Sequence, residues 1–155
     1  MEASTGHIKL FLRSLRMYNA ISGERLDKAM SLYERLTKTT SAPTGMPSGG
    51  GADRGSVLAS FADSVTDAGQ WLDICEAKHK LVMDFLNDAP LSETHRAILV
   101  NRYIRRMKWA AVIYEIRDLN KMSLRKVFYE HNKALEICAE WVNRTGKYKK
   151  EVLEV

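Results

Sequence analysis

The chain of 155 residues is long enough for one domain with its own core, or for a small domain with a helical extension, and too short for two full domains. Its formal net charge of +5 is unevenly spread: residues 96–150 hold 14 Lys and Arg against 5 Asp and Glu, whereas residues 1–95 hold 10 against 12. The apolar runs are far too short to cross a bilayer, and the first residues lack the basic and apolar pattern of a secretory signal. We therefore expect a cytoplasmic protein with no membrane partner and with a polyanion-binding surface near its C-terminus; the alternative for those cations is an ordinary solvated helical face.

The first predicted element is a helix over about residues 8–38. Its apolar residues recur at three- and four-residue steps, as on one face of a helix: Ile8, Leu12, Leu15, Leu26, Ala29, Tyr33 and Leu36. Asn19, Ser22 and Gly23 interrupt this stripe and suggest a weak point or kink. Residues 39–56 contain Pro43, Pro47 and the run Gly49–Gly51, which predict a flexible loop.

A heptad pattern over residues 57–88 predicts a second long helix, of about 30 residues and roughly 45 Å. Its apolar seam is Leu58, Phe61, Val65, Ala68, Leu72, Cys75, His79, Val82 and Leu86. The loop allows the first helix to fold back antiparallel onto this seam, although the same seam also suits a second subunit. Leu72→Asp is expected to unfold the hairpin, because an unpaired carboxylate in the apolar seam costs several kcal/mol or must take up a proton.

The segment Pro-Leu-Ser at residues 90–92 is expected to end the second helix. Three shorter helices are expected after it, at about 93–106, 108–117 and 123–142. Ser92 and Ser123 are suitable N-caps, and the Ser123 hydroxyl can accept from the amide of Arg125 or Lys126. The chain shows no alternating β-branched run. The predicted fold is all-α, with a long antiparallel helical hairpin followed by a C-terminal helix-turn-helix bundle.

The two last helices are amphipathic and joined by a turn, which is typical of a helix-turn-helix. Their apolar faces are expected to be Trp109, Val112, Ile113 and Ile116 on the first, and Leu124, Val127, Phe128, Ala134, Leu135 and Cys138 on the second. The outward face of the second then carries the candidate DNA-binding residues Ser123, Arg125, Lys126, Tyr129, Asn132 and Lys133. Arg125, Lys126 and Tyr129 are expected to read bases, and Asn132 and Lys133 to contact the backbone.

The order of these segments, with APTGMPSGGGAD between the long helices and ILVNRYIRRMKW before the helix-turn-helix, resembles the ArpU-like and RinA-like phage transcriptional regulators. The most specific pieces are the run from Met46 to Gly51, and Arg102-Tyr103-Ile104 followed by Trp109. The C-terminal parts of that family look like region four of sigma factors, so the resemblance implies promoter DNA or RNA polymerase as a partner. It places Trp109, Val112, Ile113 and Ile116 on the supporting helix and Ser123, Arg125, Lys126 and Val127 at the start of the recognition helix. The turn at residues 117–122 is about four residues longer than in the family.

Other chemistry is weakly indicated. Cys75 and His79 stand four residues apart, but no third metal ligand is near, and buried seam positions are the expectation for both. His131 lies on the inner face of its helix without a nucleophile partner, so we expect no catalytic residues, no metal and no cofactor.

The sequence thus predicts three regions: a helical hairpin at 1–90 for oligomerisation or partner contact, a DNA-binding domain at 91–146 and a basic, charged tail at 147–155. The predicted function is that of a phage-type transcriptional regulator in the bacterial host cytoplasm, binding double-stranded DNA as a homo-oligomer, and not an enzyme. Two alternatives stay open: a DNA-packaging protein of the small terminase kind, and an interaction protein that binds RNA polymerase or a sigma factor without specific DNA binding.

Overall fold

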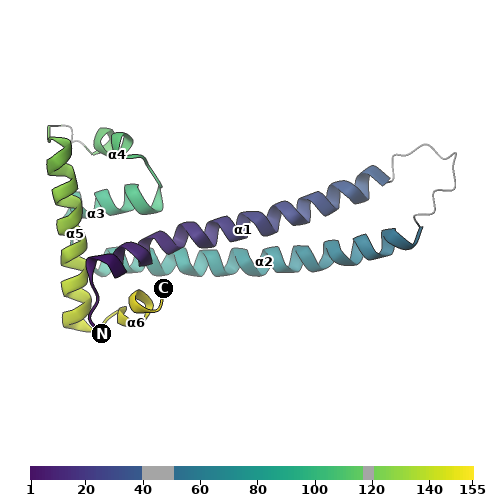
Figure 1. The fold of residues 1–155 in the computed structure, drawn as a ribbon, viewed down its shortest axis with the longest axis horizontal. Helices are drawn as coiled ribbons and strands as arrows, with labels where there is room; N and C mark the ends of the chain where they lie inside the picture. The colour runs from purple at the N-terminus through teal and green to yellow at the C-terminus, as the bar shows by residue number, and fades with distance from the viewer. Residues whose placement is uncertain (40–50, 117–120) are drawn as a thin grey trace. The chain divides into compact units, whose positions relative to one another are not determined.

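A computed structural model describes the backbone of residues 1–39, 51–116 and 121–155. Its helices are α1 (Thr5–Thr39), α2 (Gly51–Asp88), α3 (Glu93–Leu99), the π-helical turn η1 (Val100–Ile104), α4 (Trp109–Glu115), α5 (Leu124–Thr145) and α6 (Lys149–Leu153) (Figure 1). No strand occurs in these ranges, which confirms the predicted all-α class. Within them, no helix is both long and apolar enough to traverse a bilayer.

The chain divides into two compact units. The body comprises residues 1–17 and 78–155, and the arm comprises residues 18–77. The body therefore includes the start of α1 and the end of α2, which the sequence analysis had assigned to the hairpin region. Of the 24 Lys and Arg and 19 Asp and Glu, the body holds 19 and 11 (net +8), leaving 5 and 8 in the arm (net −3).

In the arm, α1 and α2 run antiparallel, as predicted. Tyr18 packs near Trp71 with ring centroids 6.4 Å apart, and Tyr33 near Phe61 at 5.9 Å. Between these pairs, the Arg25 guanidinium lies 3.4 Å from the Asp67 carboxylate. Rising numbers on α1 meet falling numbers on α2, which fixes the antiparallel direction.

The seam of the arm differs from the predicted one. Ala68 and Cys75 are buried and Phe61 is half-buried, but Leu58, Val65 and Leu72 are about half exposed, as are Leu26 and Tyr33 on α1. The buried and half-buried residues of α2 in the arm are Val57, Phe61, Ser64, Asp67, Ala68, Trp71 and Cys75. The small side chains of Ala29 and Ser64 are buried between the helices, so the larger Met30 and Val65, one position further along, are left at the flank. Leu72 is 51% exposed, so the buried seam position on which the expected unfolding by Leu72→Asp depended is wrong.

Three further expectations need correction. Residues 51–56, predicted as loop, form the first turns of α2, because the helix already begins at Gly51, the last residue of the Gly run; residues 40–50 of the predicted loop lie outside the described residues. α1 is helical throughout Thr5–Thr39, so Asn19, Ser22 and Gly23 do not interrupt the helix. His79, predicted to lie in the seam, is exposed, because the inward positions beside it are Cys75, Lys78 and Val82.

The core of the body surrounds Phe85 near the end of α2. Its ring contacts Phe11 of α1, Trp141 of α5 and Tyr148 at centroid distances of 5.1, 5.7 and 5.5 Å. The left-handed Gly146 (φ 71°) ends α5, and its N–H donates to the Val142 carbonyl, which turns the chain back toward this core. The predicted charged tail is therefore folded: it forms α6, whose Val152 is buried.

Candidate nucleic-acid interface

A small three-helix cluster carries the predicted helix-turn-helix. Ile98 of α3, Val112 and Ile116 at the end of α4, and Val127 of α5 form one buried apolar group, with Trp109 and Ile113 packed against it. The apolar face predicted for the supporting helix is thereby confirmed. The helix predicted at 93–106 is α3 followed by η1, that at 108–117 is α4, and that at 123–142 is α5. Residues 117–120, most of the longer turn noted in the sequence, lie outside the described residues.

The start of α5 is capped as the sequence predicts. The Ser123 hydroxyl accepts a hydrogen bond from the Lys126 amide at 3.3 Å. Val127, Ala134, Leu135 and Cys138 are buried as expected, but Leu124 and Phe128 are 53% and 38% exposed. Phe128 packs one edge against the Trp109 ring, with centroids 5.0 Å apart, and Leu124 precedes the first inward turn, so neither is enclosed. The N-terminal turns of α5 therefore present apolar as well as cationic side chains.

All six candidate DNA-binding residues of the sequence analysis are exposed along α5: Ser123, Arg125, Lys126, Tyr129, Asn132 and Lys133. The Tyr129 ring lies between two cations, with Lys126 Nζ 4.9 Å and Lys133 Nζ 5.9 Å from its centroid. Cation–π contacts of this kind hold long lysine side chains close to the helix. The exposed face is thus an ordered group of cations around one aromatic ring.

The charge of Lys126 is partly neutralised by Glu130 on the same helix. Its Nζ lies 2.9 Å from the Glu130 carboxylate, whose other oxygen is 2.7 Å from His95 Nε2 of α3. These hydrogen bonds, first from Lys126 and then from His95, lower the pKa of Glu130, and the Glu130 contact raises the pKa of Lys126. By contrast, Arg125 makes no ion pair with any described residue. Arg125 therefore has more of its charge available to a partner than Lys126.

Beneath this face, α5 is joined to η1 by a buried polar pair. The Tyr103 hydroxyl is hydrogen-bonded to His131 Nε2 at 3.0 Å, and the two rings stack with centroids 5.8 Å apart. Burial, and next the nearby charge of Lys9, lower the pKa of His131 to about 4; Arg102 and Arg13 act in the same direction. The imidazole is therefore neutral at physiological pH. Burial likewise raises the pKa of Tyr103, while Arg13 and Arg102 oppose that shift.

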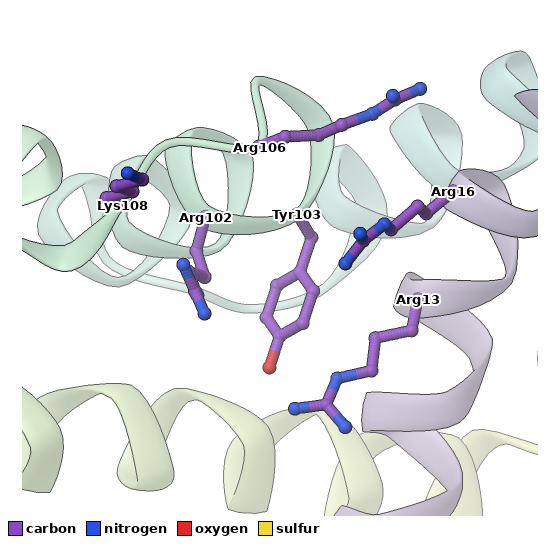
Figure 2. A pocket seen from close by; sticks show the side chains of 6 residues that line it. All are labelled: Arg13, Arg16, Arg102, Tyr103, Arg106 and Lys108. Carbon is purple, nitrogen blue, oxygen red and sulfur yellow. The ribbon is translucent and has the colours of Figure 1, made fainter. Parts of the chain in front are cut away.

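Tyr103 lies in a hollow of about 380 Å³ surrounded by cations. Arg13 and Arg16 come from α1, Arg102 from η1, and Arg106 and Lys108 from the segment that leads to α4 (Figure 2). Figure 2 shows the guanidinium groups of Arg13 and Arg102 turned toward the hydroxyl end of Tyr103, with Arg16 beside its ring and Arg106 extending away. We call these five cations, with Tyr103, the basic pocket. No acidic residue is among the described residues that line it.

The local backbone explains how η1 and the segment after it position Arg102 and Arg106. Hydrogen bonds from the Arg105 amide to the Val100 carbonyl (3.0 Å) and from the Met107 amide to the Asn101 carbonyl (2.9 Å) close the turn. The Arg102 guanidinium donates to the Met107 carbonyl at 2.8 Å and lies 5.0 Å from the Trp109 ring centroid. Inside this frame Arg106 adopts a left-handed conformation (φ 57°), which is costly for a residue with a Cβ. The backbone is thus strained at Arg106, the residue whose side chain is turned outward.

Arginines clustered without acidic neighbours are suited to bind phosphate oxygens, because the planar guanidinium donates two parallel hydrogen bonds. Pockets for small organic ligands are, by contrast, lined mainly by apolar groups. The sequence analysis missed Arg13 and Arg16, since it counted charge along the chain and both belong to residues 1–95, where acidic residues slightly outnumber basic ones. Their spacing of three on an exposed helical face was the available signal.

The remaining candidates carry no comparable site. Cys75 is buried in the arm and its thiol donates to the Asn19 side-chain oxygen at 3.5 Å. Among the described residues, no three His, Cys, Asp or Glu side chains converge as metal ligands would. No family model matches the chain, and neither a curated protein nor a solved structure shows significant similarity to it.

Proposed function

We propose that this protein binds double-stranded DNA through one continuous surface formed by the basic pocket and the exposed face of α5. The observation that carries the proposal is the cluster of five cations without an acidic lining residue. Phosphate contacts by such a cluster release counterions, which supplies most of the affinity for any duplex.

The pocket and α5 are physically linked, and this supports a single interface. Tyr103 in the pocket is hydrogen-bonded to His131 of α5, and His131 directly precedes Asn132 of the exposed α5 face. A duplex that placed a phosphate in the pocket would then lie against the helix that carries Arg125 and Tyr129. This arrangement fits a helix-turn-helix, in which the second helix enters the major groove and neighbouring residues hold the backbone.

Within this proposal the residues have different roles. Arg13, Arg16 and Arg106 anchor phosphates, while Arg125 and Tyr129 at the N-terminal end of α5 face base edges. Lys126 shares its charge with Glu130 and is a weaker candidate for base reading than the sequence analysis supposed. Lys133, further along the helix, is proposed to contact phosphate.

The finer proposal follows the resemblance to the ArpU-like and RinA-like regulators: a phage-type transcriptional regulator that acts on promoter DNA in a bacterial host cytoplasm, by binding and without catalysis. Binding to RNA polymerase without specific DNA affinity, and assembly into a DNA-packaging ring, are outcomes that the experiments below distinguish.

The first test is direct titration of fluorescent duplexes with the full chain at several salt concentrations. A logarithmic salt slope of about −4 to −6 is expected if five to six cations meet phosphates. Arg13→Gln combined with Arg16→Gln should weaken binding to every duplex and reduce the slope by about 2. The matched control removes two positive charges from the arm, with Lys28→Gln and Arg54→Gln, and should change neither quantity appreciably.

The second test concerns base reading, with duplexes selected from a random pool. Arg125→Ala should cost about 1–3 kcal/mol on a selected site and much less on random DNA, whereas Lys133→Ala should weaken both alike. If neither the pocket variant nor Arg125→Ala alters DNA affinity, the proposal fails, and polymerase binding by the same surface becomes the function to measure. A ring-sized mass in solution would instead favour the packaging role.

A further inference from the structure

We infer that the arm carries a second interface, an uncharged face on which another copy of this chain docks to form a dimer. This inference rests on residues 18–77 alone, and it holds whether or not the body binds DNA. Its starting point is a group of large apolar side chains that the intramolecular seam does not cover: Leu26, Met30, Tyr33, Leu58, Val65 and Leu72.

These six residues lie on one side of the arm. Each follows an inward-facing position by one residue: Leu26, Met30 and Tyr33 come after Arg25, Ala29 and Leu32, and the three on α2 come after Val57, Ser64 and Trp71. One residue is a rotation of about 100°. Because α1 and α2 run antiparallel, that rotation turns both helices toward the same side, where the two apolar stripes adjoin.

This side lacks charge. From Gly23 to Tyr33 on α1, and from Leu58 to Leu72 on α2, every described position that follows an inward-facing residue is uncharged. The charges of the arm lie elsewhere around the helices, for example at Asp27, Lys28 and Asp63. A solvated helix would distribute charges over such a face, so their exclusion indicates a partner that is itself uncharged there.

The same side also contains Gly23, Ala62 and Gly69. A side chain added at Gly23 or Gly69 would meet no other atom within 4 Å in the single chain, so nothing inside the arm requires these glycines. Glycine is unfavourable within a helix. Its presence on this face allows another backbone to approach closely.

The size of the face favours a second copy as the occupant. The six side chains are between 44% and 57% exposed, so their burial removes roughly 500 Å² from water on each copy. Two copies related by a two-fold axis would bury about 1,000 Å² in total, the lower bound for a specific interface. A second copy supplies an uncharged face of equal size, and the four helices then form an antiparallel bundle in which each helix has two neighbours.

The experiment is sedimentation equilibrium of the full chain. The wild type is expected to sediment as a dimer at about 10 µM. Val65→Glu with Leu72→Glu should weaken the dimer at least about 100-fold, because four carboxylates would enter an apolar interface. The matched control, Ala59→Glu with Gln70→Glu, adds the same charge to the other sides of α2 and should leave the dimer intact.

Circular dichroism checks that each variant keeps its helix content. Should the charged pair lose helix, the neutral pair Leu58→Gln with Leu72→Gln takes its place, with weaker association again expected. A wild-type chain that stays monomeric up to about 100 µM overturns the inference. The inference is also overturned if the Val65→Glu, Leu72→Glu variant dimerises as strongly as its control. DNA binding by the monomeric variant leaves the proposed function standing, so the two proposals fail separately.

Discussion

Protonation of His131 should destabilise the body, and the effect can be isolated with one substitution. The side chain is 5% exposed, hydrogen-bonded to Tyr103, and its pKa lies at about 4 instead of the usual 6.5, first because of burial and then because of Lys9, Arg102 and Arg13. Above pH 6.5 the imidazole is neutral in both the folded and the unfolded chain and adds no pH dependence. Between pH 6.5 and about 4 the unfolded chain takes up a proton that the folded chain excludes, so the free energy of unfolding falls as the pH falls.

The whole gap between the two pKa values corresponds to about 3 kcal/mol. Part of it arises from exposed cations that solvent and salt screen, so we expect a loss of roughly 1–2 kcal/mol between pH 7 and pH 5. The assay is urea unfolding at the two pH values, with His131→Gln as the reference, since glutamine still offers Tyr103 a polar partner but does not titrate. Carboxylates such as Glu130 contribute equally to both proteins and cancel in the comparison. Equal losses in wild type and variant, or a protonated His131 in the folded chain at pH 5.5 by NMR, would refute the reasoning.

Two further predictions concern stability. Gly146→Ala should lower the free energy of unfolding by about 1 kcal/mol, because Gly146 has φ 71°, whereas Gly55→Ala on α2, where a Cβ meets nothing within 4 Å, should raise it by about 0.5–1 kcal/mol; denaturant melts measure both. Phe85→Ala should cost about 3–5 kcal/mol, because Phe85 is fully buried among three aromatic rings; thermal unfolding checks this, and a loss below about 1 kcal/mol would mean that the ring cluster is not the centre of the body.

Local signals in the sequence were sufficient for the helices and their caps. Three- and four-residue spacing predicts α1, α2 and α5, and the Ser123 cap follows from one hydroxyl placed before an apolar run. The choice of seam in the arm was not determined in this way. α2 carries two adjacent stripes that share Phe61, Ala68 and Cys75. The sequence analysis followed the one through Val65 and Leu72, while the folded arm turns Ser64 and Trp71 inward. Close approach of two helices is a property of the pair, which the pattern of one helix does not contain.

The candidate site likewise has one part that the sequence predicts and one part that it does not. Arg125, Lys126, Tyr129, Asn132 and Lys133 share one helix face, so spacing alone was enough to group them. The basic pocket joins Arg13 and Arg16 to Arg102 across more than 80 residues of chain, and its Arg106 depends on a left-handed turn closed by hydrogen bonds between residues five and six apart. Neither a charge count along the chain nor helical periodicity reports such a convergence.

Charge separates the two proposed interfaces physically. The body, at net +8, is attracted to phosphate, whereas the arm, at net −3, is repelled by it. An apolar face on a strongly basic unit would compete with DNA for the same surface, and a basic pocket on the arm would place like charges against each other in a dimer. In this protein the cations surround Tyr103 in the body, and the Val65–Leu72 side of the arm is uncharged. Both conflicts are avoided, because the body's surface disfavours a second copy and the arm's surface disfavours DNA. A charge introduced on the Val65–Leu72 side of the arm should therefore act on self-association, and a charge removed from the pocket should act on DNA affinity, with little exchange between the two effects.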